Sequence, residues 1–323
     1  MKLSVCMITF NQEKYIAQAI DSVLMQEVDF EYEIVIGDDC SVDGTIDILR
    51  GFQQRFPEKI RLLLNKKNLG VTDNFAQTLK ACSGEYVALL EGDDYWTSSS
   101  KLRKQVDFLE LHPDYITCYH STRLVDRIGE VKLLIPRVEH KKPTSTLIDL
   151  IRDDSFMATC SIVFRNKAFD YFPDVFYVWK SGCDWPLNVL NSEQGPIGFI
   201  DEVMSDYRSG SGEFSWTSKP LSEIMSEAVK FNLAFNAYFN YRYDDIFQLK
   251  IANYYYVIAI DLLRQQKVFQ AISSLNESLK LRVNALLIVR VIFIDGPKSY
   301  FRGWLHLHMP KTVSVLKALW GRA

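Results

Sequence analysis

Three acidic side chains follow a short apolar run in the first third of the chain. Residues 86–90 read YVALL, and Glu91, Asp93 and Asp94 come directly after them. Carboxylates crowded at the end of a buried strand lose hydration and repel one another, which is costly unless a cation compensates. Carboxylate oxygens are the ligands that Mg²⁺ and Mn²⁺ prefer. The spacing therefore predicts a divalent metal ion that neutralises Glu91 and Asp93 and bridges them to a diphosphate.

The sequence lacks the motifs of several common nucleotide-binding and hydrolytic sites. It contains no GxGxxG after the first apolar run, no GxxxxGK[ST], no GxSxG and no HExxH. Its five histidines are scattered, apart from His306 and His308 near the end of the chain. These absences exclude an ordinary dinucleotide-binding, P-loop or zinc-protease site, and they leave carboxylate chemistry as the main candidate.

Alternating strands and helices must position the acidic residues. Apolar runs predict strands at residues 3–10, 32–39, 59–65 and 85–94, and helical spacing of apolar residues predicts a helix after each. This alternation implies parallel strands joined by right-handed crossovers, and continuous apolar runs are typical of strands covered on both faces. We therefore expect an α/β fold built on a mostly parallel sheet.

Polar residues at the ends of three of these strands converge on one edge of the predicted sheet. The first strand ends in TFN at residues 9–11, the second in GDDCS at 37–41 and the fourth in EGDD at 91–94. In an open parallel sheet, ligands bind at the carboxyl ends of the strands. The acidic residues should therefore face a ligand-binding crevice.

The pattern changes further along the chain. Residues 115–210 mix short strand-like and helical patterns, and a helical pattern rich in Tyr and Phe begins near Ser222. We predict a first domain over residues 1–216 and a helical C-terminal region over residues 217–323. The aromatic residues are expected to pack between helices, since this is the commoner use of such residues at helical spacing.

Cysteine usage and hydropathy bear on the compartment. The six cysteines are scattered without a CxxC pair, which is typical of reduced thiols in a cytoplasmic protein. The run MKLSVCMITFN turns polar at Asn11 without a small-residue cleavage site, so it predicts a strand and not a signal peptide. No segment has 18 uninterrupted apolar residues, and we therefore predict no membrane-spanning helix.

Charge is distributed unevenly, although the net charge of the 323-residue chain is only −3. Ten Lys and Arg but two Asp and Glu lie between Arg264 and the C-terminus, interleaved with apolar and aromatic residues such as Trp304 and Trp320. We predict no nucleic-acid partner. A cationic, aromatic end favours an anionic membrane surface, and we expect peripheral attachment through residues 280–323. The alternative is that these helices pack on the acidic first domain and balance its charge.

Four motifs together resemble one protein family. The stretches SVCMITFNQEKYIAQAIDSVLMQ, EIVIGDDCSVDGT, NLGVTDNF and GEYVALLEGDDYW, in this order and spacing, resemble the family 2 glycosyltransferases with the GT-A fold. The resemblance covers residues 1–115 firmly and 116–216 more weakly. The EGDDYW stretch is similar to the subset that builds bacterial surface polysaccharides. The resemblance implies a nucleotide-sugar donor, most readily UDP-linked, and a saccharide or lipid-linked saccharide acceptor at the inner face of the cell membrane.

The resemblance also implies roles for residues along the strand ends. Phe10 is expected to stack on the nucleotide base, and Asp39, with Asp38 beside it, to accept from the base imide. Residues 91–93 (EGD) match the DxD metal motif, with Glu91 as the first acid, and Asp94 matches the adjacent acid that contacts sugar or metal. The full donor-binding set implied is Thr9, Phe10, Asn11, Asp39, Asn68, Asp93 and Asp94.

A later stretch, GCDWPL, matches the acidic motif of the acceptor side. It makes Asp184 the candidate catalytic base and Trp185 part of the acceptor wall. A base on the face opposite the leaving diphosphate implies direct displacement with inversion. One departure concerns the stretch DYRSG, which in many relatives reads Tyr-Arg-x-His. This chain has Gly210 at that place, which leaves a water molecule or Arg208 to replace the imidazole.

Structural explanations of the same residues stay open. The acids of residues 91–94 could form a solvated turn, Asp39 a turn or helix cap, Phe10 part of the core, and Asp184 a helix start. Two other functions also stay open. A sugar nucleotidyltransferase usually carries a Gly-rich loop after the first strand, which TFNQEKY lacks. A non-catalytic nucleotide- or saccharide-binding relative would keep the fold and lose the chemistry. The sequence does not indicate the oligomeric state.

Overall fold

The structure is a computed structural model that describes residues 1–137, 141–153, 156–166, 172–179, 182–210 and 220–281. The chain divides into two compact units, Met1–Ser218 and Lys219–Ala323. The strands of the first unit are β1 (Leu3–Thr9), β2 (Tyr32–Asp38), β3 (Ile60–Leu64), β4 (Tyr86–Glu91), β5 (Tyr95–Trp96), β6 (Thr117–Val125), β7 (Val131–Ile135), β8 (Thr144–Ser145), β9 (Val163–Arg165) and β10 (Ile197–Arg208). Its helices are α1 (Ile16–Leu24), α2 (Thr45–Arg55), α3 (Val71–Lys80), α4 (Lys101–Leu111), α5 (Leu147–Asp153) and α6 (Asp184–Ser192), with short 3₁₀ turns η2 (Thr159–Ser161) and η3 (Asp174–Val178).

The strands form one sheet in the order β3-β2-β1-β4-β9-β6-β10-β5, with β7 paired to β6 and β8 paired to β10. Strands β1 to β4, which alternate with helices along the chain, are parallel to one another. Strand β10 is parallel to β6. Strand β9 lies antiparallel between β4 and β6 and so joins the two parallel parts. The predicted α/β fold, with a mostly parallel central sheet, is confirmed.

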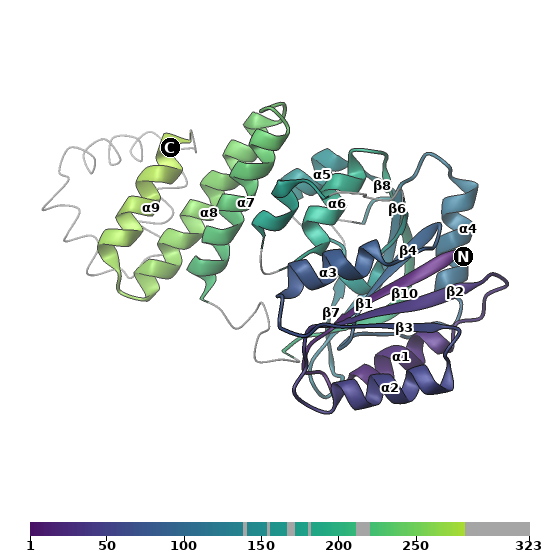
Figure 1. Cartoon of the computed structure of the whole chain (residues 1–323). Coiled ribbons are helices and arrows are strands. Elements are labelled where there is room, and N and C mark those ends of the chain that lie inside the picture. Colours follow the sequence, from purple (N-terminus) through teal and green to yellow (C-terminus); the bar gives the residue numbers. More distant parts are fainter. Residues whose placement is uncertain (138–140, 154–155, 167–171, 180–181, 211–219, 282–323) are drawn as a thin grey trace, which may run out of the picture. The chain divides into compact units, whose positions relative to one another are not determined.

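Helices cover both faces of the sheet. Leu3, Val5 and Met7 of β1 point to one face and are fully buried in the main hydrophobic cluster, together with residues of α1, α2 and α4. Figure 1 shows α1 and α2 side by side on this face. Helix α3 packs on the opposite face, where Asn74 Nδ2 donates to the carbonyl of Gly37 at 3.0 Å. Coverage on both faces explains why these strands are continuous apolar runs.

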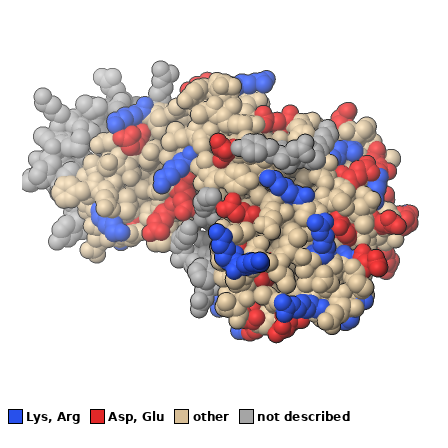
Figure 2. Space-filling model, in the orientation of Figure 1, with Lys and Arg blue, Asp and Glu red and all other residues tan. Residues whose placement is uncertain are grey.

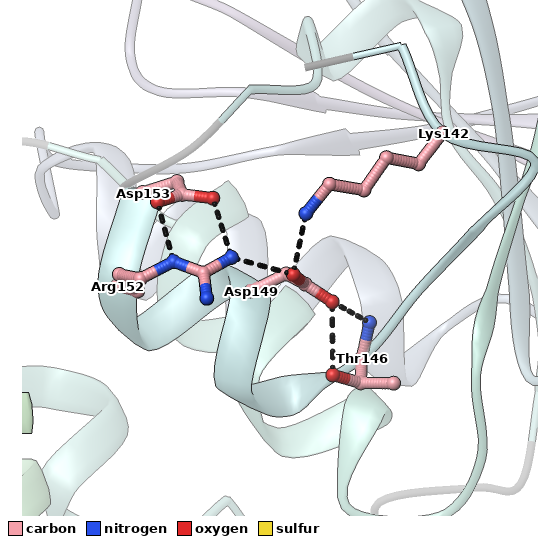
Figure 3. A network of polar contacts seen from close by, with 5 residues as sticks. All are labelled: Lys142, Thr146, Asp149, Arg152 and Asp153. Atoms are coloured by element: carbon pink, nitrogen blue, oxygen red, sulfur yellow. Dashed lines mark hydrogen bonds and ion pairs between the residues drawn. The ribbon is translucent and has the colours of Figure 1, made fainter. Parts of the chain in front are cut away.

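A polar network fixes the start of α5 (Figure 3). The Asp149 carboxylate accepts from both the backbone N–H and the hydroxyl of Thr146 at 2.9 Å, and from Lys142 Nζ at 2.7 Å. Arg152 bridges Asp149 and Asp153 one turn later. Burial raises the pKa of Asp149, but the bonds from Lys142 and Thr146 outweigh it and lower the pKa overall. Since α5 contacts α6, this cap supports the helix that begins at Asp184.

Ion pairs account for much of the charged surface of the first unit. Lys2 pairs with Glu85 and Glu110, and Lys104 pairs with Glu202. Figure 2 shows acidic and basic side chains intermingled over the visible face. All six cysteines are free, and all except Cys40 are buried, in agreement with the expectation of reduced thiols.

The described part of the second unit consists of three helices. They are α7 (Leu221–Tyr238), α8 (Asp244–Arg264) and α9 (Val268–Lys280). Short connections join them, and α8 packs against both α7 and α9. Phe231, Phe235 and Phe247 are buried between them, so these aromatic rings serve packing, as predicted. Within residues 1–281, allowing for the gaps given above, α8 alone is long and apolar enough to cross a membrane, and half of its most apolar stretch is buried.

Candidate active site

The ends of β1, β2 and β4 lie side by side, and we call this region the carboxyl edge. In register, Thr9 is paired with Asp38, and Ile8 with Glu91. The ladder continues past the strands, because Asp39 N donates to the carbonyl of Thr9 at 3.0 Å and Gly92 N to that of Ile8 at 3.0 Å. The three polar strand ends predicted to converge are therefore adjacent.

Gly92 is required where the β1 and β4 ends meet. A Cβ at this position would lie 2.4 Å from Gln12 Oε1, 2.8 Å from Ile16 Cδ1 and 3.0 Å from Thr9 Cβ. A side chain fits here only if the ends of the Gln12 and Ile16 side chains move away, and it would still crowd Thr9. The glycine between Glu91 and Asp93 is thus explained by a close approach between two loops of the carboxyl edge.

The two neighbouring aspartates after β2 have different surroundings. Asp38 is fully buried and accepts from the backbone N–H of Ser41 at 2.9 Å and from its hydroxyl, so it fixes the turn. Asp39 is 3% exposed and accepts from Leu69 N at 2.7 Å, Gly70 N at 2.9 Å and Asn65 Nδ2 at 3.3 Å. A carboxylate offers about four lone-pair positions, which leaves Asp39 one further acceptor position.

Four further residues of the predicted donor-binding set lie at the end of β1, directly after it, or in the loop at residues 65–70. Thr9 is buried and its hydroxyl donates to Gln12 Oε1 at 2.8 Å, whereas Phe10 is part-exposed. Asn11 is exposed and adopts a left-handed φ of 53°, and its Oδ1 accepts from Val42 N at 2.8 Å. Asn68 is exposed, and its Oδ1 accepts from Gly70 N at 3.0 Å. The available surface in this group belongs to Phe10, Asn11 and Asn68.

Four carboxylates meet beyond the end of β4, and we call them the carboxylate cluster: Glu91, Asp93, Asp94 and Asp184. Burial, then the charges of Asp93 and Asp184, raise the pKa of Glu91 to about 8. Burial, then Asp93 and Glu91, raise the pKa of Asp94 well above its usual range. Burial raises the pKa of Asp184, the first residue of α6, although backbone N–H groups at the helix start oppose this. The predicted metal and base residues are therefore brought together.

Tyr207 was not predicted from the sequence, yet it lies among these carboxylates. Burial, then the negative charges of Glu91, Asp94, Asp93 and Asp184 in that order, raise the pKa of its phenol well above its usual range. A phenol that stays protonated is a hydrogen-bond donor to carboxylate or phosphate oxygens. The signal that could have found it is the stretch DYR, although its distance of over 100 residues from Glu91 hides the contact.

Arg208, next to Tyr207 at the end of β10, is tied to the same segment. Its backbone N–H donates to Asp94 Oδ1 at 2.7 Å, and its Nη1 donates to the main-chain carbonyl of Asp93. Asp94 is 1% exposed, and its second oxygen, Oδ2, is buried without a hydrogen-bond partner in the part of the chain that the structure covers. The last residues of β10 thus complete a site that begins at β4.

Two tryptophans stand next to Asp184. Trp185 is 6% exposed, and its ring meets that of Trp179 edge to face, with centroids 6.0 Å apart. Trp179 is part-exposed, and its carbonyl accepts from the Thr72 hydroxyl on α3 at 2.8 Å. A Cβ added to Gly182 would lie 3.0 Å from Trp179 Nε1 and 3.5 Å from Asp184 Oδ1. Trp179, which the sequence analysis did not select, is therefore the more accessible ring beside Asp184.

The carboxylate cluster fits a divalent cation by its chemistry. Among the described residues Asp94 Oδ2 is buried without a hydrogen-bond partner, and burial, then the neighbouring carboxylates, raise the pKa values of Glu91 and Asp94. Within the described ranges, no three His, Cys, Asp or Glu side chains are already arranged around one metal position. Mg²⁺ commonly takes one or two carboxylates and fills its shell with substrate phosphates and water. An incomplete set of protein ligands is what such an ion needs.

Solved structures of similar fold agree with this architecture. The crystal structure of residues 1–349 of TarS from Staphylococcus aureus in complex with UDP-GlcNAc has a TM-score of 0.63 and 20% identity, covering 90% of this chain and 84% of that one. The mannosyltransferase PcManGT from Pyrobaculum calidifontis, in complex with GDP-Man and Mn²⁺, has a TM-score of 0.53 and 15% identity, covering 98% of this chain and 84% of that one. The first unit has the GT-A class of fold, which confirms the fold that the resemblance implied.

The family follows from the sequence match. Residues 4–172, more than half of the chain, match the family model described as Glycosyl transferase family 2. The chain belongs to this family, and the resemblance stated from the motifs is confirmed.

Relatives match the chain over part of their length. An uncharacterised protein of Mycobacterium tuberculosis (strain ATCC 25618 / H37Rv) is 36% identical over 208 residues, which are 64% of this chain and 58% of that protein. The poly(ribitol-phosphate) beta-N-acetylglucosaminyltransferase TarS of Staphylococcus aureus (strain Mu50 / ATCC 700699) is 34% identical over 114 residues, 35% of this chain and 19% of that protein. The chain thus spans little more than half of the first relative.

Proposed function

We propose that the chain is an inverting, metal-dependent glycosyltransferase that moves a sugar from a nucleotide-sugar donor to a saccharide or lipid-linked saccharide of the bacterial cell surface. The observation that carries this proposal is the gathering of Glu91, Asp93, Asp94 and Asp184 at the carboxyl edge of a GT-A sheet. An array of negative charge next to a nucleotide-binding edge suits a cation that arrives with a diphosphate.

The proposed donor is UDP-linked. TarS, whose fold is similar, binds UDP-GlcNAc, and the mannosyltransferase of similar fold binds GDP-Man and Mn²⁺. In this chain Phe10 would stack on the base, and Asp39 would accept from the base imide at its one unused acceptor position. Asn11 and Asn68, both exposed, would contact the donor. Asp39 would keep its contacts with the loop at residues 65–70 while the base is bound.

Glu91 and Asp93 would hold the metal ion, and Asp94 would contact the ion or the donor sugar. When bound, the ion would act as a Lewis acid on the leaving diphosphate. The deprotonated form of Glu91 is the one that binds a cation, so the proton that this part-buried side chain holds below a pKa of about 8 must leave first. The Tyr207 phenol would donate to an oxygen of the cluster or of the diphosphate.

Asp184 would remove the proton from the acceptor hydroxyl. Its pKa is raised by burial, which increases the basicity of the carboxylate relative to one in water. Its place at the start of α6 fixes the direction of the carboxylate, and the α5 network supports that helix. With the base on one face of the sugar and the diphosphate on the other, displacement inverts the anomeric centre.

The acceptor would lie against Trp179 and Trp185. Trp179 presents the more accessible ring, and the buried Trp185 packs against it edge to face. A flat apolar ring beside the base suits the C–H face of a sugar. TarS, by its name, acts on poly(ribitol-phosphate), a polymer rich in hydroxyl groups, and this supports a polymeric acceptor of that kind here.

We propose cytoplasmic location with peripheral attachment to the inner face of the membrane through the basic C-terminal segment. Residues 282–323, which make up most of this segment, lie outside the described part of the chain. The support is therefore compositional: cations interleaved with tryptophans are typical of interfacial segments. The division into a catalytic domain at 1–216 and a membrane-associating helical region at 217–323 belongs to the same proposal.

A thermal-shift screen of nucleoside diphosphates and their sugars, with and without Mn²⁺, tests the function. We expect UDP to raise the melting temperature only when Mn²⁺ is present. A protein that no nucleoside diphosphate stabilises would refute the proposal. Binding without hydrolysis of any nucleotide sugar would favour the non-catalytic alternative, and pyrophosphate release from UTP with a sugar phosphate would favour the nucleotidyltransferase.

A further inference from the structure

Arg208 is a buried cation that is anchored at both terminal nitrogens of its guanidinium, whereas its Nε has no hydrogen-bond partner among the described residues. It is 8% exposed, and its Nη2 donates to Gln18 Oε1 of α1 at 2.9 Å. Its guanidinium lies over the ring of Tyr15 at 4.5 Å and over that of Tyr95 at 5.1 Å. One side chain of β10 thus connects α1, β5 and the β1–α1 loop.

Arg208 also makes two contacts with the turn at residues 91–94, which we call the acidic turn. Its backbone N–H donates to Asp94 Oδ1 at 2.7 Å, and its Nη1 donates to the main-chain carbonyl of Asp93. Within the turn, Asp94 N donates to the carbonyl of Glu91 at 3.1 Å, and Gly92 N donates to that of Ile8 at 3.0 Å. Arg208 therefore holds the part of the turn that carries the second and third acids.

Physical chemistry indicates why an arginine is used. Burying a cation costs free energy unless hydrogen-bond acceptors, charge or π-density compensate, and here two aromatic faces and the oxygens of Asp93 and Gln18 do so. A planar fork can donate to Gln18 and to Asp93 at the same time, whereas an ammonium on a single stem cannot span both acceptors. The arrangement depends on the shape of the side chain as well as on its charge.

We infer that Arg208 is a positioning residue that fixes the Asp93–Asp94 turn before metal and donor bind, with Gln18 as its anchor. Its effect on metal and diphosphate affinity rests on the proposed function, but its effect on the turn does not. A preset turn lowers the ordering cost of binding, and losing it weakens the affinity for the metal-bound nucleotide.

The test compares Arg208→Lys and Gln18→Ala with the wild type and with Arg165→Lys. Arg165 is a matched control, because its guanidinium also donates to main-chain carbonyls, those of Tyr115 and Leu109, away from the carboxylate cluster. Gln18 is exposed, so its truncation removes the anchor of Arg208 without opening the core. The measurements are amide hydrogen exchange of residues 91–97 in metal-free protein and the affinity for UDP in the presence of Mn²⁺.

We expect Arg208→Lys to accelerate exchange in residues 91–97 and to weaken Mn²⁺-dependent UDP binding about tenfold. Gln18→Ala should accelerate exchange and weaken UDP binding to a smaller extent. Arg165→Lys should lower the melting temperature but leave both the exchange of residues 91–97 and the UDP affinity unchanged. Wild-type exchange in both Arg208→Lys and Gln18→Ala would overturn the inference, as would equal acceleration in Arg165→Lys. A wild-type protein that does not bind UDP with Mn²⁺ would refute the proposed function instead, and the exchange data would still decide the role of Arg208.

Discussion

Replacing Glu91 with glutamine should stabilise the metal-free protein. Burial and the charges of Asp93 and Asp184 raise the pKa of Glu91 from 4.5 to about 8. Between these values the folded state holds a proton that the unfolded state releases. The free energy of unfolding of the wild type must therefore fall as the pH rises from about 4.5 to about 8. Glutamine is neutral at every pH and removes this loss.

The size of the effect follows from the shift. At pH 7, which is about 2.5 units above the pKa of Glu91 in the unfolded chain, the unfolded state has lost this proton and the folded state keeps it. Each pH unit is worth about 1.4 kcal/mol, so the free energy of unfolding is lowered by about 3 kcal/mol. Glu91 is only part-buried by its surface area, so solvent screens the cluster and this value is an upper limit. Below pH 4.5 the difference between wild type and variant should vanish.

Urea unfolding in EDTA, followed by tryptophan fluorescence between pH 4 and pH 8, measures this difference. Glu33→Gln is the matched control with the opposite sign. Burial raises the pKa of Glu33, but bonds from Ser4 and Ser83 outweigh it and lower the pKa overall, so its carboxylate adds stability above its unfolded pKa. Its replacement should destabilise the protein at pH 7. A Glu91→Gln variant whose stability gain is absent, or equal at pH 4 and pH 8, would show that Glu91 is not in a crowded carboxylate site.

Four further outcomes are expected. Asp93→Ala should abolish Mn²⁺-dependent turnover of UDP-sugars without loss of stability in EDTA, and wild-type turnover would contradict the metal assignment. Asp184→Asn should keep UDP affinity while kcat falls roughly 10²-fold or more, as for loss of a general base; an equal loss of UDP binding would place Asp184 in the nucleotide pocket. Trp179→Ala should raise the KM for the acceptor more than Trp185→Phe does, with donor affinity unchanged, and equal values would remove Trp179 from the acceptor wall. The full chain should sediment with anionic vesicles at low salt, at about 1 kcal/mol per cation near the surface, and a chain ending at residue 279 should not; full-length protein left in the supernatant would exclude attachment.

The sequence predicted those site residues that directly follow an apolar strand. Thr9, Asp39 and Glu91 each follow an apolar run, and parallel strands bring such ends together, so the carboxyl edge was predictable. The strand pattern alone could not separate Asp38, which fixes a turn, from Asp39, which faces the loop at residues 65–70, because both follow the same strand; the family resemblance selected Asp39. The β-strand alternation places neighbours on opposite sides but does not say which side is open.

Other parts of the site depend on contacts that chain order hides. Tyr207 and Arg208 reach the acidic turn only because β10 pairs with β6 and β5 at the far side of the sheet. A sequence pattern gives the strand but not its neighbour. Likewise, Trp185 is buried as the second residue of α6, whereas Trp179 lies outside that helix and is more exposed. This difference depends on tertiary packing, which the sequence pattern does not reveal.

The absence of space at Gly92 has a consequence for evolution and engineering. A Cβ added to Gly92 would lie within 3.0 Å of side-chain atoms of Gln12, Ile16 and Thr9, so the loop that would read the base packs closely against the turn that would hold the metal. We therefore expect substitutions in the loop after β1 to disturb the acidic turn as well. Libraries that aim to change the proposed donor preference should vary residues 10–16 and 91–94 jointly.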